Sequence, residues 1–217
     1  MRIGILGSGL MGGKLGTIFA RAGHEVVFSY ARTRDKLDTL ADEAGRSARA
    51  GTPAEAARDA DALLLAVHWS RVDDVLGQAG DLGGTPLLTC SLPMNADDTA
   101  LVVAHTSSGA EELARKAAGA RVVSAFGTVP SEVLFGVYAA RRRKQRPSLV
   151  YAGDDADANA VAAQLIGDAG FDAVDAGPLR TARYLEPFTL LMARLAYEGD
   201  AGPAIAYRFE RYAELEG

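Results

Sequence analysis

The sequence predicts an α/β protein of the Rossmann type, in which a doubly wound, mostly parallel sheet carries a small C-terminal α/β extension. Three observations predict it. A glycine-rich turn follows a short apolar strand at the start of the chain, strand and helix patterns alternate as far as residue 126, and residues 148–175 continue with strand, helix and strand. Such alternation is typical of parallel strands that are covered by helices on both faces.

The glycine-rich turn has the spacing G-x-G-x-x-G and lies between an apolar strand at 2–6 and a helical pattern at 14–22. In dinucleotide-binding folds the first glycine permits the tight turn, the second lets the backbone approach the pyrophosphate, and the third lets the helix pack on the strand. The helix N-terminus then offers free N–H groups to the phosphates. We therefore expect a dinucleotide to contact Gly7, Ser8, Gly9, Leu10, Met11 and Gly12.

Five further strands are expected before residue 130, at 25–30, 46–50, 61–67, 85–92 and 121–126. Helical patterns separate them, and two of these begin with a capping box. Thr52-Pro53-Ala54-Glu55 is one, and Ser108-Gly109-Ala110-Glu111 is the other. Together these elements complete two mononucleotide-binding halves, which predicts a cofactor domain over residues 1–135.

Residues 136–217 are expected to form a smaller domain with acceptor-site and dimer contacts. After a short helix at 131–139 and the basic run 141–146, the patterns predict a strand at 148–152, a helix at 154–169, a strand at 171–175 and a helix at 179–198. A last helix is expected to run toward Glu214. The stripe on the long helix predicts core or subunit interface and contains Leu185, Phe188, Leu191, Met192 and Leu195.

Composition excludes several classes of function. The net charge of −5 gives no general attraction for nucleic acid or anionic membranes, and the single cysteine, Cys90, excludes an intramolecular disulfide and a cysteine-rich metal site. Cys90 is interpreted as a buried small hydrophobe. No signal peptide or membrane-spanning run is evident, so a cytoplasmic location, with neither membrane nor nucleic-acid partners, is expected.

The end of the second predicted strand indicates NADP rather than NAD. NAD-binding folds place an acid there to bind the ribose 2′-hydroxyl, whereas this chain has none and continues with cations that suit a 2′-phosphate. The residues expected to bind this part of the cofactor are Ser29, Tyr30, Arg32, Thr33, Arg34 and Lys36. Val67, His68 and Trp69 follow the fourth strand, where His68 has either a cofactor contact or a plain loop role.

No acid–base couple is evident. The Tyr-x-x-x-Lys pair of short-chain dehydrogenases is absent, and none of the three histidines, His24, His68 and His105, is paired by sequence with an acid. His24 and His105 are interpreted as structural. This composition fits a hydride transfer in which the second partner is itself a cofactor that carries its own chemistry.

Several segments resemble the F420-dependent NADP oxidoreductases, in the right order along nearly the whole chain. They are the glycine fingerprint, Gly109–Ala114, Val122–Phe126 with Thr128-Val129-Pro130, Gly153-Asp154-Asp155 and Asp175–Leu179. The resemblance implies a homodimer that exchanges hydride between NADP(H) and a deazaflavin or flavin-type acceptor such as coenzyme F420. It also implies that Gly127, Thr128 and Pro130 line the nicotinamide and acceptor site.

The sequence departs from this family at Gly127, where archaeal members have His and many bacterial relatives have Asn. Alternatives therefore stay open. One is a reductase of imines or β-hydroxyacids, which the short, strand-containing C-terminal part and the lysine positions disfavour. Another is a non-catalytic NADP-binding regulatory dimer. The basic run Arg141–Arg146 is either a solvated loop or a site for an anionic tail such as that of F420.

Overall fold

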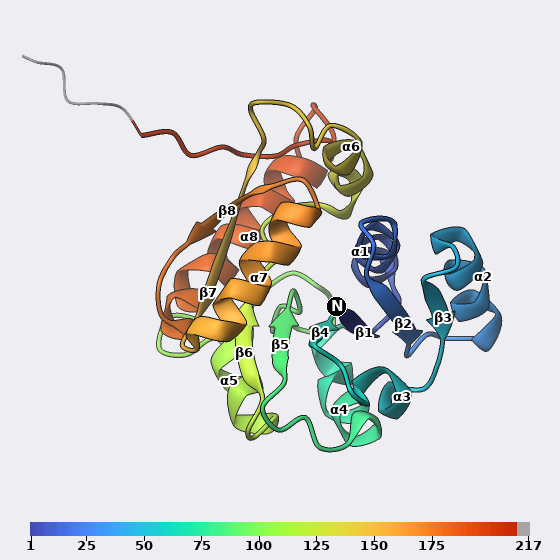
Figure 1. Ribbon diagram of the computed structural model, residues 1–217. Coiled ribbons are helices and arrows are strands. Elements are labelled where there is room, and N and C mark those ends of the chain that lie inside the picture. Colours follow the sequence, from blue (N-terminus) through green and yellow to red (C-terminus); the bar gives the residue numbers. More distant parts are fainter. Residues whose placement is uncertain (212–217) are drawn as a thin grey trace, which may run out of the picture.

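The computed structural model describes residues 1–211 (Figure 1). Eight strands form one sheet in the order β3-β2-β1-β4-β5-β6-β7-β8, which confirms the Rossmann-like α/β class. All neighbouring strands are parallel except β6 and β7, which are antiparallel. The strands are β1 (Arg2–Leu6), β2 (Glu25–Ser29), β3 (Ala48–Ala50), β4 (Ala62–Leu65), β5 (Pro86–Thr89), β6 (Arg121–Ser124), β7 (Ser148–Gly153) and β8 (Asp172–Asp175).

Helices cover both faces of this sheet, which runs from β3 at the right of Figure 1 to β8 at the left. The helices are α1 (Leu10–Arg21), α2 (Arg34–Ala44), α3 (Pro53–Ala57), α4 (Val72–Ala79), α5 (Gly109–Lys116), α6 (Leu134–Ala139), α7 (Ala156–Asp168) and α8 (Ala182–Tyr197). No helix within residues 1–211 is both long and apolar enough to cross a membrane.

Alternate side chains along each strand pack into two hydrophobic cores, one on each face of the sheet. Ile5, Phe28 and Leu64 pack with helices α1, α2 and α7, whereas the neighbouring Leu63 and Leu65 point to the other face and pack with α3, α4 and α5. The two-residue alternation of a strand therefore places apolar side chains on both faces, as a sheet covered by helices on each side requires.

The capping residues that the sequence singles out do cap the helices. Thr52 and Glu55 form a reciprocal capping box at the start of α3. At the start of α5 the Ser108 hydroxyl accepts from the Glu111 N–H at 3.2 Å. There the Glu111 carboxylate binds Arg183 of α8 at 2.7 Å instead of returning to the cap backbone.

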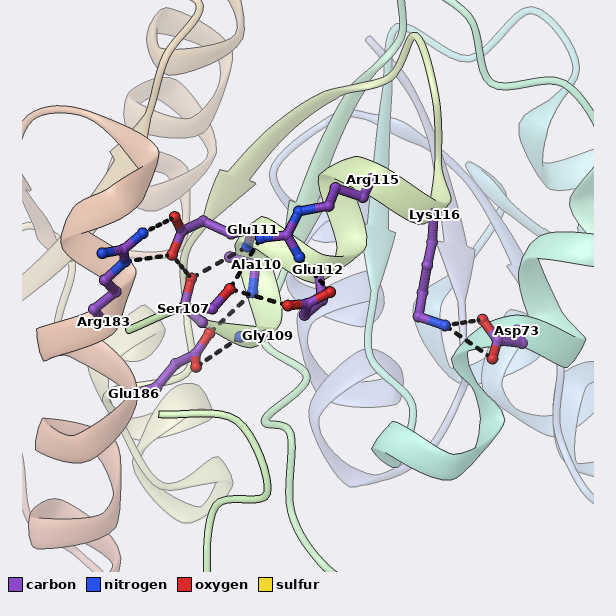
Figure 2. Close-up of polar contacts among 11 residues, drawn as sticks. Asp73, Ser107, Gly109, Ala110, Glu111, Glu112, Arg115, Lys116, Arg183 and Glu186 are labelled. Atoms are coloured by element: carbon purple, nitrogen blue, oxygen red, sulfur yellow. Dashed lines mark hydrogen bonds and ion pairs between the residues drawn. The ribbon is translucent and has the colours of Figure 1, made fainter. Parts of the chain in front are cut away.

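A second carboxylate, this one on α8, also joins α8 to α5 (Figure 2). Glu186 accepts hydrogen bonds from the N–H groups of Gly109 at 2.9 Å and Ala110 at 3.0 Å, and it is 4 % exposed. These N–H groups have no partner within α5, because the first turn of a helix leaves its donors free. Glu186 and Arg183 thus hold α8 against the first turn of α5, although the two helices are more than 70 residues apart in the chain.

The expected last helix is wrong within the described residues. Residues 204–211 are not helical, and Glu214 lies outside the described part of the chain. Instead, the segment runs beside β7, where Ser148 N–H donates to the Tyr207 carbonyl at 2.8 Å. The Tyr207 ring packs edge-on against Phe188 with centroids 5.1 Å apart. This contact and the backbone hydrogen bond stabilise an extended tail in place of a helical turn.

We expect Glu186 to make the stability depend on pH. Burial raises the pKa of its carboxyl from 4.5 to about 7, although the two backbone hydrogen bonds act in the opposite direction. Between these values the unfolded chain ionises Glu186 while the native chain keeps the proton. The free energy of unfolding should therefore fall as the pH rises through this window, by about 3 kcal/mol at most, and level off above it.

Chemical denaturation of the wild type and Glu186→Gln from pH 4.5 to 8 measures this dependence. The variant should lose that part of the slope, whereas Glu198→Gln, an exposed change near the end of the same helix, should keep it. Identical slopes in the wild type and Glu186→Gln would contradict the assignment.

Candidate functional site

A cleft opens at the carboxyl ends of β1, β2 and β4, where ligands bind in open α/β sheets. Its volume is about 670 Å³, and we call it the cofactor cleft. It brings together residues that are up to 67 positions apart in the chain. They are Gly7, Ser8, Gly9, Leu10, Tyr30, Ala31, Arg32, Lys36, Ala66, Val67, His68, Arg71 and Asp74.

The glycine turn is built so that the backbone forms one wall of this cleft. Gly7 has a φ of 112°, a conformation that side chains disfavour, and a Cβ there would overlap the Ala66 carbonyl. A Cβ on Gly12 would overlap the Gly7 carbonyl, whereas one on Gly9 would meet open space. Gly9 begins α1 without a side-chain cap, and no acidic residue lies in the first turn. The N–H groups of that turn therefore favour an anion.

The rim of the cleft beside β2 is cationic. Arg32, Lys36 and Arg71 line it together with one carboxylate, Asp74. The Asp74 side chain accepts from the Tyr30 hydroxyl and from Gln78 at 3.1 Å. The hydrogen bond from Tyr30 is the main reason that the pKa of Asp74 lies below its ordinary value. Three cations against one carboxylate that is already hydrogen-bonded favour an anionic ligand.

Several residues expected at the cofactor do not line this cleft. Ser29 is fully buried, and its hydroxyl donates to the Ile5 carbonyl at 2.7 Å. Thr33 caps α2, Trp69 begins a short 3₁₀ turn, and Gly12 packs beneath the glycine turn. Arg34 is directed toward Asp38, at 3.2 Å, and the Ala50 carbonyl, at 3.4 Å.

Four cleft residues are not revealed by the sequence pattern, namely Ala31, Ala66 and the charged residues Arg71 and Asp74. The two charged residues follow the fourth strand, Arg71 at the end of a 3₁₀ turn and Asp74 in the first turn of α4. His68 does line the cleft, and it is paired with an acid after all. Its Nε2 lies 3.0 Å from Asp98, which belongs to the loop after β5. Asp98 is 30 residues away, so no local motif could have predicted the pair.

A second, smaller cavity of about 240 Å³ shares one lining residue, Leu10, with the cofactor cleft. We call it the apolar cavity. It lies between the start of α1, the segments after β5 and β6, and the C-terminal half of α8. Its walls are Leu10, Met11, Cys90, Leu92, Gly127, Val129, Pro130, Ser131, Thr189, Met192, Ala193 and Tyr197.

Two of the three residues expected at the acceptor site line this cavity, namely Gly127 and Pro130. Thr128 does not. It is 3 % exposed, and its hydroxyl forms a 2.7 Å hydrogen bond with the Tyr207 hydroxyl. Tyr207 also accepts from the Val150 N–H at 3.1 Å, so the extended tail supports the segment that forms the cavity wall.

The chain enters this segment in a strained conformation. Phe126 is fully buried and has a φ of 65°, and Tyr30, at the end of β2, has a φ of 56°. Left-handed conformations cost non-glycine residues roughly 1–2 kcal/mol and persist where the surroundings enforce them. Both follow the carboxyl end of a strand, on the side of the sheet where the cleft and the cavity lie. Residue identity gives no sign of this strain, because Phe and Tyr rarely adopt such angles.

Cys90 is an inert part of the cavity wall. Its thiol donates to the Leu65 carbonyl at 3.7 Å, and burial raises its pKa to about 12. A neutral thiol is a weak nucleophile, which agrees with its interpretation as a small hydrophobe. Within residues 1–211 no three side chains of His, Cys, Asp or Glu gather as metal ligands would.

The basic run lies beyond α6 and lines neither the cleft nor the cavity. Arg141 stacks on the Tyr138 ring at 4.1 Å, and Arg146 binds Asp172 at 2.6 Å. Arg142 and Arg143 line a shallow surface hollow with Gly136, Ala139 and Ala140. The run therefore forms no part of the wall of either space.

Comparisons with known proteins agree with this arrangement. Residues 2–93, which contain β1 to β5, match the model of the family described as NADP oxidoreductase coenzyme F420-dependent. A crystal structure from Arthrobacter sp. FB24, described as a "putative f420 dependent nadp-reductase", superposes with a TM-score of 0.84 at 24% identity, covering 97% of this chain and 100% of that one. A hypothetical protein from Sinorhizobium meliloti has a TM-score of 0.75 at 26% identity, with 97% and 96% covered.

A reductive aminase from Aspergillus terreus, in complex with NADPH4, cyclohexanone and allyl amine, has a TM-score of 0.63 at 18% identity. It covers 88% of this chain, but this chain covers only 60% of the aminase. Its likeness concerns the fold. The match over residues 2–93 is to the family that the sequence motifs indicate, the coenzyme F420-dependent NADP oxidoreductases, and it supports an NADP-dependent oxidoreductase.

Proposed function

We propose that this chain transfers hydride between NADP(H) in the cofactor cleft and a flat, conjugated acceptor of the flavin or deazaflavin type in the apolar cavity. The observation that carries the proposal is that the two spaces are neighbours, with Leu10 in the wall of each. One has a cationic end and a bare helix N-terminus, and the other is apolar. The family description and the fold of its neighbours favour the same reaction class.

The residues of the cleft fit the cofactor. The first turn of α1 would hold the pyrophosphate, because its N–H groups have no capping side chain. Arg32, Lys36 and Arg71 would hold the 2′-phosphate, which NADP carries and NAD lacks. When bound, the cofactor supplies or takes up a hydride at its nicotinamide ring. The apolar wall of Met11, Val129 and Met192 excludes water beside the acceptor.

The proposed hydride transfer does not require an acid or base with a shifted pKa in the cavity. An acceptor of the flavin type carries its own electron sink, so the protein has to supply orientation and a dry surface. Gly127 keeps this part of the cavity free of a side chain, since a Cβ there would already contact Thr189 Oγ1 at 3.5 Å and the Cys90 carbonyl at 3.8 Å.

A homodimer is part of the proposal. The stripe on α8 is divided by the structure, which buries Leu185 and Met192 but leaves Leu191 52% and Leu195 48% exposed. Tyr184 on the same helix is 74% exposed. A monomer would keep these apolar side chains in water, and a two-fold contact between copies of α8 would bury them.

The cationic end of the cleft predicts cofactor preference. Arg32→Ala removes one charge-assisted contact with the 2′-phosphate, so NADPH should bind about tenfold or more weakly, while NADH affinity stays within about twofold. Arg34→Ala is the matched control, because its guanidinium is held by Asp38 and Ala50. Fluorescence titration of both cofactors measures the effect. Equal affinity of the wild type for NADPH and NADH would rule out this assignment.

Gly127 offers a direct test of the acceptor site. An alanine Cβ would lie 3.5 Å from Thr189 Oγ1, an ordinary contact, so Gly127→Ala should keep its activity. Gly127→Leu should occupy part of the 240 Å³ cavity and raise the KM for the acceptor by about tenfold or more, because a bound ring and the leucine compete for the same space. NADPH oxidation with F420 or a flavin, followed spectrophotometrically, measures both variants.

The outcomes separate the alternatives. NADPH binding without turnover of any flavin or deazaflavin would indicate a regulatory NADP-binding protein or a reductase of another substrate. Equal acceptor KM values for Gly127→Ala and Gly127→Leu would place the acceptor elsewhere.

The exposed face of α8 predicts the oligomeric state. Leu191→Lys with Leu195→Lys places two charges in the proposed interface and should convert a dimer to a monomer in sedimentation equilibrium at micromolar concentration. A pair of exposed changes on another helix, Asp42→Lys and Glu43→Lys in α2, should leave the dimer intact. A wild type that sediments as a monomer of 22.7 kDa would exclude the dimer.

A further inference from the structure

The polar groups of the apolar cavity have their protons engaged inside the protein. The Thr189 hydroxyl donates to the Leu185 carbonyl at 2.9 Å, and the Cys90 thiol donates to the Leu65 carbonyl at 3.7 Å. The Tyr197 hydroxyl donates to Glu132 at 2.9 Å. A carbonyl or carboxylate oxygen can only accept, so the directions of these hydrogen bonds are fixed by their partners.

Ser131 belongs to the same pattern. Lys14 of α1 donates to the Ser131 hydroxyl oxygen at 3.2 Å and to its carbonyl at 3.0 Å. Because an ammonium group can only donate, the Ser131 oxygen accepts there, and its own proton is directed to Glu132 at 3.3 Å. Lys14, Ser131, Glu132 and Tyr197 thus form one chain of hydrogen bonds along the edge of the cavity, from α1 to α8.

Glu132 sets the direction of this chain, because it accepts from both hydroxyls. Burial acts to raise the pKa of its carboxyl, but the hydrogen bond from Tyr197, those from the backbone and Ser131, and the charge of Lys14 outweigh it and lower the pKa. Burial and then Glu132 raise the pKa of Tyr197 to about 12. At neutral pH the pair is therefore a carboxylate and a neutral phenol, and the phenol proton stays between them.

Ser131 and Tyr197 both line the cavity, and because their protons are engaged, their hydroxyl oxygens can only accept a hydrogen bond from a ligand. We propose that the cavity selects a conjugated acceptor whose ring carries an N–H, and that Tyr197 and Ser131 accept a hydrogen bond from it, with Glu132 as the positioning residue that fixes their polarity. This rests on the proposed function and specifies its substrate class. An acceptor that offers only carbonyl oxygens at this edge would place lone pairs against lone pairs and lose hydrogen bonds that it makes in water.

The test uses two probes that differ only in this group, 5-deazariboflavin and its N3-methyl derivative, which lacks the ring N–H. Each is titrated by fluorescence into the full-length protein saturated with NADP⁺. The wild type should bind the N–H probe about fivefold more tightly, the value of one net hydrogen bond. Equal dissociation constants, or tighter binding of the methylated probe, would overturn the inference while leaving the proposed function intact.

Variants separate the hydrogen bond from the bulk of the methyl group. Tyr197→Phe should reduce the ratio of the two dissociation constants at least twofold, because an acceptor is lost, whereas a purely steric penalty would persist unchanged. Glu132→Gln should also narrow the ratio, since an amide no longer holds both hydroxyl protons. Tyr184→Phe and Glu198→Gln, exposed changes on or beside α8 outside the cavity, should keep the wild-type ratio.

NADP⁺ affinity of each variant, measured in the same titrations, shows that the fold is intact. If Glu132→Gln fails this check, Tyr197→Phe decides. An unchanged ratio in Tyr197→Phe would overturn the inference. Failure of both probes to bind a protein that binds NADP⁺ normally would overturn the proposed acceptor class as well. This outcome therefore separates a failure of the proposed function from a failure of the present inference alone.

Discussion

The candidate site depends on one junction, the hydrogen bonds between Glu186 of α8 and the first N–H groups of α5. They hold a helix from the end of the chain against the helix between β5 and β6, and the bidentate Arg183–Glu111 pair adds to them (Figure 2). The face of α8 that carries Thr189, Met192 and Tyr197 can then close the apolar cavity. A buried carboxylate is costly, and here the unpaired donors of a helix N-terminus offset part of that cost.

The cleft and the cavity differ in how they are supported. Backbone geometry forms the cleft, through the close approach of Gly7, Gly12 and Ala66 and the left-handed turn at Tyr30. Side chains from distant elements form the cavity, and the hydrogen bond between Thr128 and Tyr207 supports its wall from behind. The first kind of site is fixed by a short motif, and the second requires that the C-terminal elements already be in place.

This difference explains what could be predicted from the sequence. The strand order along the chain, both helix caps, the glycine turn and the cationic segment after β2 are local patterns, and the structure contains them. Periodicity and motifs gave no signal for Arg71 in the cleft. They also gave none for the pairs His68–Asp98 and Glu132–Tyr197, because the partners in each pair are far apart in the chain. The tail at Tyr207 has helical composition, but packing on Phe188 and pairing beside β7 decide its conformation. Arg34 is a cation at an expected cofactor position, but it binds the neighbouring Asp38 and does not line the cleft.

The positions of the two sets of lining residues along the chain have a consequence for the order in which the site forms during synthesis. Every residue that lines the cofactor cleft lies before residue 75, so this part of the chain leaves the ribosome before α8 does. The apolar cavity needs α8, and the wall behind it needs Tyr207, which emerges later still. A nascent or truncated chain can therefore assemble the nucleotide half of the site well before the acceptor half. Proteolysis near the C-terminus would remove the support of the acceptor wall while sparing the nucleotide half.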